Sequence, residues 1–273
     1  MTLKTGLWPV LFLCTVFFPP ASAGQWPLSA PAISIIIDDM GNQFKTGYRA
    51  VTLPGAVACA FLPRVPYTHK LAVMAHSYNK EVMLHAPMQA QGNNRLGPGG
   101  LTVDMSQEEF LKTLRDDIAS VPHVRGISNH MGSLLTQHPD HMVWLMGEIN
   151  RQGNLFFLDS KTTSKSVASH VAGDFGIPNV ERDVFLDNIR EEAEIDKQFK
   201  RLIKIAKQKG SAVAVGHAYH PTLQYLEREL LKLEEYGVKL IPLSRMIEHR
   251  KRSQPSWQVS LSPSLRVVKS LKQ

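Results

Sequence analysis

The chain has 273 residues with 31 lysines and arginines, 24 aspartates and glutamates, and a formal net charge of +7. Most of this charge lies at the C-terminal end, because seven lysines and arginines oppose a single glutamate from Arg245 onward. Residues 24–244 are therefore neutral overall, which argues against a nucleic-acid-binding face. The length suffices for one large α/β domain, which we expect at residues 24–250, followed by a basic flexible tail at residues 251–273.

The first 23 residues have the pattern of a secretory signal peptide. Lys4 precedes an apolar stretch at residues 7–18, and the small residues at 21–23 match a cleavage site. The apolar stretch is short for a membrane span. We therefore expect cleavage after Ala23 and export to the periplasm, with an uncleaved N-terminal anchor as the alternative. Cleavage would leave Cys59 as the one cysteine, so the mature chain has no internal disulfide.

Strand-like and helix-like segments alternate along the rest of the chain. Apolar segments predict strands at residues 33–37, 57–62, 81–84, 124–128, 154–158, 180–185, 212–215 and 239–242. Helical segments fill the gaps, at residues 43–53, 110–119, 142–151, about 191–210 and 221–237. Ser106 with Glu109 forms a capping box, and Asn188 with Glu191 can cap the long helix that ends at Gly210.

This alternation predicts a distorted or incomplete (β/α) barrel of seven to eight parallel strands, with a doubly wound open sheet as the alternative. No glycine-rich fingerprint follows the first strand, which disfavours a dinucleotide-binding fold.

The first predicted strand ends in two adjacent carboxylates, Asp38 and Asp39. A buried strand cannot carry two uncompensated carboxylates, so we expect both at its exit, where water or a metal can meet them. The carboxyl ends of strands are also where α/β folds place their chemistry. Helix capping is the alternative role for the pair, but Asn42 is available for that.

Other predicted strands also end in polar residues. His85 follows the third strand and His130 the fourth, Asp159 and Ser160 follow the fifth, and His217 follows the seventh. These groups should meet at one end of a parallel sheet. One carboxylate with two imidazoles is a common ligand set for Zn²⁺ or a similar divalent ion.

In these motifs the chain resembles the divergent polysaccharide deacetylases, relatives of the NodB-like carbohydrate esterases. The resemblance covers most of residues 32–245 and rests on five motifs, at residues 37–41, 84–88, 129–133, 158–160 and 216–217. It implies a barrel of the deacetylase type. It also implies that Asp38 is a catalytic base, that Asp39 is a metal ligand, and that His217 is the acid that protonates the leaving amine.

The chain departs from the family pattern in two places. The wider family has His-x3-His after its third strand, whereas His85 is followed four residues later by Gln89. We expect His130 to replace the missing ligand, so that Asp39, His85 and His130 hold a divalent ion, with zinc preferred. The Arg-x-Pro segment usual after the fourth strand is also absent.

The remaining expectations concern outer contacts and function. Asp159, with Ser160 beside it, could orient His217 or a metal-bound histidine. The resemblance implies an exported metal-dependent hydrolase that removes N-acetyl groups from an envelope polysaccharide. A non-catalytic glycan-binding or scaffold protein on the same fold is the main alternative, and hydrolysis of another bond is a third. The basic tail could contact anionic envelope surfaces, or could be a solvated segment with no partner.

Overall fold

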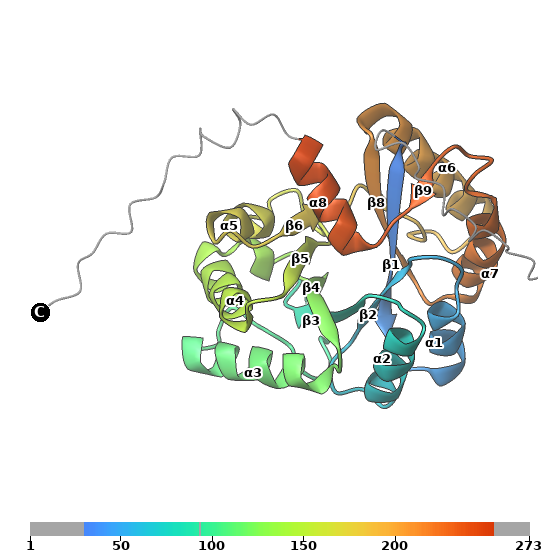
Figure 1. Cartoon of the computed structure of the whole chain (residues 1–273). Helices are drawn as coiled ribbons and strands as arrows, with labels where there is room; N and C mark the ends of the chain where they lie inside the picture. Colours follow the sequence, from blue (N-terminus) through green and yellow to red (C-terminus); the bar gives the residue numbers. More distant parts are fainter. Residues whose placement is uncertain (1–29, 93, 254–273) are drawn as a thin grey trace, which may run out of the picture.

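The computed structural model of the chain describes residues 30–92 and 94–253. In this part a curled sheet of parallel strands is surrounded by helices (Figure 1). The strands are β1 (Ala32–Met40), β2 (Ala58–Phe61), β3 (Val82–Met88), β4 (Val124–Met131), β5 (Phe156–Asp159), β6 (Asn179–Glu181), β7 (Val184–Phe185), β8 (Ser211–His217) and β9 (Lys239–Leu240). The helices are α1 (Phe44–Val51), α2 (Thr68–Ser77), α3 (Gln107–Ser120), α4 (Pro139–Gln152), α5 (Ala168–Asp174), α6 (Glu192–Lys209), α7 (His220–Glu229) and α8 (Leu243–Ser253), with short 3₁₀ turns at Leu135–Gln137 and Leu230–Lys232.

The two end strands of the sheet, β6 and β7, are connected by the short segment between them. Its order is β6-β5-β4-β3-β2-β1-β8-β7, with β9 beside β1. β6 and β7 follow each other in sequence, yet they pair in parallel with β5 and β8 at opposite ends of this order. Between them, the Arg182 N–H donates to the Asp159 carbonyl at 3.1 Å and the Asp183 N–H donates to the Val213 carbonyl at 2.9 Å. The predicted incomplete barrel is confirmed, and the single strand predicted at residues 180–185 is corrected to two short strands.

The apolar run of the first strand fits a strand that is buried on both faces. Ile33, Ile35 and Ile37 belong to the larger core cluster, which the sheet forms with the surrounding helices. Ile36 belongs to a second cluster with Met83 and other side chains of the barrel interior. Because side chains alternate along a strand, a continuous apolar run fills both layers.

Helix α8 closes the end of the barrel opposite to the strand exits. Its Leu243 and Met246 are buried within the interior cluster. Arg250 donates from Nε to Ser211 Oγ, at the start of β8, at 3.1 Å and also pairs with Asp183. Since α8 continues to Ser253, residues 251–253 belong to this helix and not to the predicted tail.

Of three helix caps and ends predicted from the sequence, one is confirmed and two are wrong. The capping box of Ser106 and Glu109 is confirmed at the start of α3. The cap predicted from Asn188 and Glu191 is wrong, because Glu191 occupies the N-cap of α6 without a side-chain cap bond. The helix predicted at residues 221–237 is shorter, since α7 ends at Glu229 and a 3₁₀ turn follows.

The predicted signal peptide, residues 1–23, and most of the predicted tail, residues 254–273, lie outside the described residues. Within the described part, no helix has both the length and the apolarity needed to cross a bilayer.

Candidate functional site

The exit of β1 brings two adjacent carboxylates to the same place. Successive side chains of a regular strand point to opposite faces. Asp39 interrupts this alternation with a left-handed φ of 58°, a conformation that few non-glycine residues adopt. As a result, His85 Nε2 lies 3.5 Å from Asp38 Oδ2 and 3.2 Å from Asp39 Oδ1.

The loop after this pair is packed too tightly for a side chain at Gly41. Gly41 has a φ of +115°, and a Cβ there would lie 2.2 Å from Thr68 Oγ1. The Gly41 carbonyl accepts from the Tyr67 N–H at 2.9 Å, and the Met40 carbonyl accepts from the Leu62 N–H at 2.9 Å. These contacts hold the strand exit in place against the loop that precedes α2.

The three predicted ligands come together at the strand exits. Single donor atoms of Asp39, His85 and His130 all lie within 4.8 Å of one another. His130 Nδ1 is 2.8 Å from Asp39 Oδ1, and the parallel register that pairs Pro87 with His130 places His130 one strand away from His85. His85 Nδ1 contacts Ser128 Oγ at 2.8 Å, which fixes the ring with Nε2 toward the carboxylates.

The surroundings of Asp39 fit a bound divalent ion. Its Oδ1 is buried and has no hydrogen-bond partner of acceptable geometry, although two imidazoles lie close to it. Burial opposes ionisation of this carboxyl, but the imidazoles of His130 and His85 hold its pKa well below the ordinary value. Two imidazoles and one ionised carboxylate, aimed at a common point, are the donor set expected for Zn²⁺ or a similar ion with an open coordination position.

The side chain of Gln89, at the position where the wider esterase family is expected to have its second histidine, forms a hydrogen bond with the backbone instead. Gln89 Oε1 accepts from the Val103 N–H at 2.8 Å, and the Gln89 backbone bonds to Leu101 and Leu134. The side chain therefore anchors the long segment after β3.

Asp38 is a buried carboxyl beside this ligand set. It is 2 % exposed, and its Oδ1 has no hydrogen-bond partner. Burial raises the pKa of Asp38, although the nearby His85 and His217 oppose the shift. A carboxyl with a raised pKa and a free oxygen can accept a proton more readily than a solvated one.

His217 faces the site from β8 and is held by Asp187. Its Nδ1 lies 2.9 Å from Asp187 Oδ1, and its Nε2 lies 3.6 Å from Asp39 Oδ2. The second Asp187 oxygen accepts from the His217 N–H at 2.6 Å and from Thr222 Oγ1 at 2.7 Å. Burial disfavours the charged imidazole, but Asp187 outweighs this effect and the pKa of His217 is raised.

Asp187 was not among the residues selected from the sequence. It directly follows the short strand β7 and Leu186, so it is another polar group at a strand exit. The sequence predicts one strand at residues 180–185, whereas the chain forms two short strands there, which pair at opposite ends of the sheet order.

The predicted role of Asp159 at His217 is corrected by these contacts. Asp159 Oδ1 accepts from the Lys161 N–H at 2.8 Å, and Oδ2 accepts from Ser166 Oγ at 2.7 Å. The Ser160 side chain has no hydrogen-bond partner, while its N–H donates to Asn129 Oδ1 at 2.8 Å. Both residues therefore shape the exits of β4 and β5 and contact neither His217 nor a predicted ligand through their side chains.

A cavity of about 240 Å³ opens beside the ligand set. Asp39 and His217 line it together with Gln43 and Thr46 from the start of α1 and with Tyr219 from the loop before α7. The Tyr219 ring stacks on His217 at 5.1 Å between centroids. A substrate group in this cavity would meet the predicted ligand Asp39 and the predicted acid His217.

The model of the divergent polysaccharide deacetylase family matches residues 35–247. The chain belongs to the divergent polysaccharide deacetylase family. The uncharacterized protein YibQ of Escherichia coli is 34 % identical to it over 207 residues, which are 76 % of this chain and 65 % of YibQ. The chain thus spans slightly less than two thirds of that relative.

Solved structures with low sequence identity share the fold. An uncharacterized protein from Agrobacterium tumefaciens C58 aligns with a TM-score of 0.76 and 20 % identity, covering 80 % of this chain and 89 % of its own. The peptidoglycan deacetylase PdaC of Bacillus subtilis aligns with a TM-score of 0.51 and 13 % identity, covering 82 % and 94 %. The chain therefore has the barrel fold that its motifs imply.

Proposed function

We propose that this divergent deacetylase is an exported, metal-dependent hydrolase that removes N-acetyl groups from an envelope polysaccharide. The observation that carries the proposal is that Asp38 and His217, register partners on β1 and β8, both lie beside the set formed by Asp39, His85 and His130. Asp38 Oδ2 is 3.5 Å from His85 Nε2, and His217 Nε2 is 3.6 Å from Asp39 Oδ2. A base and an acid next to a metal-ligand set are what metal-assisted amide hydrolysis requires.

Each residue has a separate role in this proposal. Asp39, His85 and His130 would hold the ion, which, when bound, polarises a carbonyl group and lowers the pKa of water to about 7. Asp38 takes the proton from the attacking water, because its Oδ1 is free and its burial raises its proton affinity. His217 donates a proton from Nε2 to the departing nitrogen, while Asp187 holds Nδ1 and stabilises the charged ring.

The substrate class rests on the family and on the name of a related fold. PdaC is a peptidoglycan deacetylase, and family members are described as polysaccharide deacetylases. Export rests on the signal-peptide pattern of residues 1–23. An N-acetylated glycan of the cell envelope is the substrate that meets both conditions.

Acetate release from N-acetylated oligosaccharides tests the proposal. The mature protein should take up about one equivalent of Zn²⁺ or Co²⁺ and release acetate, and chelation should abolish turnover. His170→Ala, an exposed position on α5, is the control and should keep full activity. Bound metal with glycan affinity but without acetate would favour the non-catalytic glycan-binding alternative.

A further inference from the structure

An arginine side chain packs on Tyr219, a residue that lines the cavity and stacks on the proposed acid. The guanidinium carbon of Arg190 lies 3.7 Å from the centroid of the Tyr219 ring. Arg190 Nη2 also donates to the Tyr219 hydroxyl at 2.9 Å. Tyr219 in turn stacks on His217 and lines the cavity. Arg190 is therefore held against a cavity-lining residue although it is solvent-exposed.

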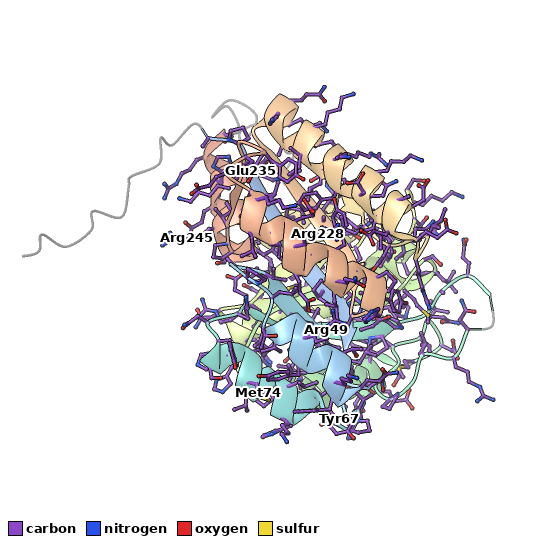
Figure 2. All side chains as sticks on the ribbon, turned by 90° about the vertical axis from the view of Figure 1, so that its right-hand side faces the viewer. Arg49, Tyr67, Met74, Arg228, Glu235 and Arg245 are labelled. Atoms are coloured by element: carbon purple, nitrogen blue, oxygen red, sulfur yellow. The ribbon has the colours of Figure 1, made fainter. Side chains whose placement is uncertain are left out.

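Arg190 differs from the neighbouring arginines in having no acidic partner. Arg49, on α1, makes a two-point ion pair with Glu227, and Arg228, on α7, pairs with Glu229 and Glu192. Figure 2 labels both on the face formed by α1 and α7. Among the described residues Arg190 makes no ion pair, so most of its N–H groups remain available to a ligand.

The negative charge near the cavity bears on the kind of ligand that Arg190 can bind. Asp39 lines the cavity, and Asp38 and Asp187 contact His85 and His217 behind it, so the carboxylate of a ligand is best placed away from this end and beside a cation. A fixed guanidinium with free N–H groups pairs well with carboxylates, often through two parallel hydrogen bonds. Tyr219 adds a flat aromatic surface on the path between Arg190 and the ligand set.

We propose that Arg190 binds the carboxylate of an acidic sugar, so that this deacetylase prefers N-acetylated glycans that carry carboxylates. The inference rests on the proposed function, because it places the N-acetyl group at the ligand set and the carboxylate on a sugar at the rim. Arg190 is a specificity residue in this arrangement and takes no part in proton transfer.

Direct binding measurements test the inference without relying on turnover. Hyaluronan tetrasaccharide and chitotetraose both carry N-acetylglucosamine, but only the first carries carboxylates. The wild-type protein should bind the acidic oligosaccharide about tenfold more tightly at low salt, and the preference should shrink as ionic strength rises. Arg190→Gln should weaken binding of the acidic oligosaccharide about tenfold and change binding of the neutral one less than twofold.

Two further variants distinguish specific binding at Arg190 from a general effect of positive charge on affinity. Lys197→Gln removes a positive charge from α6 that pairs with Glu194, and it should leave the preference unchanged. Tyr219→Phe keeps the ring and removes the hydroxyl that accepts from Arg190, so it should reduce the preference in part.

The outcomes distinguish the inference from the proposed function. A lost preference in Arg190→Gln without acetate release by any variant would support the inference and reject the hydrolase. Acetate release with equal affinity for the two oligosaccharides, or no binding of the acidic one, would overturn the inference and leave the hydrolase intact.

Discussion

The left-handed backbone of Asp39 is the smallest feature on which the site depends. It turns two consecutive side chains toward His85, although a regular strand would separate them. The adjacent carboxylates can then have different roles. Asp39 lies between two imidazoles and has a lowered pKa, whereas Asp38 is more deeply buried and has a raised pKa.

These separate roles predict different effects on metal content. Asp39→Asn and His130→Ala should each lower metal affinity by more than about 100-fold, because each removes a ligand. Ser128→Ala should lower it by about tenfold, because it frees only the outer nitrogen of His85. Asp38→Asn should retain the metal and lose turnover. Metal analysis after dialysis measures this, and full occupancy in His130→Ala would contradict the replacement of the ligand missing at Gln89.

The pairing of His217 with Asp187 makes a second prediction. His217→Ala should reduce turnover by about 10²–10⁴-fold and leave metal content unchanged. Asp187→Asn should have a loss of the same order, because it removes the charge that orients and stabilises the imidazolium. The double variant should be little worse than either single variant, since the two residues act as a unit. Independent, multiplicative losses in steady-state kinetics would argue against the pair.

At the level of elements, the sequence specified most strands and their exits but not how the sheet closes. The polar residues after the predicted third, fourth and seventh strands were found because parallel strands present their carboxyl ends at one edge. Asp187 was missed because its strand, β7, has only two residues and lies beside β8, at the opposite end of the sheet order from β6, which precedes it in the chain. A strand of two residues is too short to show a hydrophobic periodicity in the sequence.

Helix α3 carries a buried carboxyl that should make stability depend on pH. Asp117 is 0 % exposed, and burial raises its pKa to about 7, although Arg64 Nη2 lies 2.7 Å away and opposes the shift. The folded state therefore binds this proton more tightly than the unfolded chain, whose carboxyl has a pKa of 3.8. The contribution of Asp117 is fully stabilising below about pH 4 and is lost as the pH rises through about 7.

Replacing the Asp117 carboxyl tests whether its contribution to stability falls as the pH rises. Asp117→Asn cannot titrate, so its free energy of unfolding should fall less between pH 4 and pH 7 than that of the wild type. Urea unfolding at several pH values, with the exposed Asp116→Asn on the same helix as control, measures the difference. Parallel pH profiles for Asp117→Asn and wild type would show that Asp117 is ionised in the folded protein throughout this range.

At the scale of the whole molecule, one end of the barrel carries the candidate site and the other end is covered by a helix. The strand exits carry the ligand set and the cavity, while α8 covers the opposite end and packs on the interior cluster. Arg250 connects α8 to β8 and to the crossing between β6 and β7. Closure of the curled sheet therefore depends on a helix that lies far from the chemistry.

This division predicts that stability depends on α8 but not on the residues after it. Met246 is 0 % exposed inside the barrel, so Met246→Ala should lower the free energy of unfolding by about 2–5 kcal/mol. Arg245→Ala, on the same helix but exposed, should change it by less than about 0.5 kcal/mol.

Truncation after Ser253 should leave the thermal midpoint nearly unchanged, whereas truncation after Pro242 should prevent stable folding because it opens the interior cluster to water. Thermal unfolding of the four variants measures these effects. A large loss on truncation after Ser253 would mean that the C-terminal residues pack on the barrel, and that their basic and polar composition is a poor guide to their role.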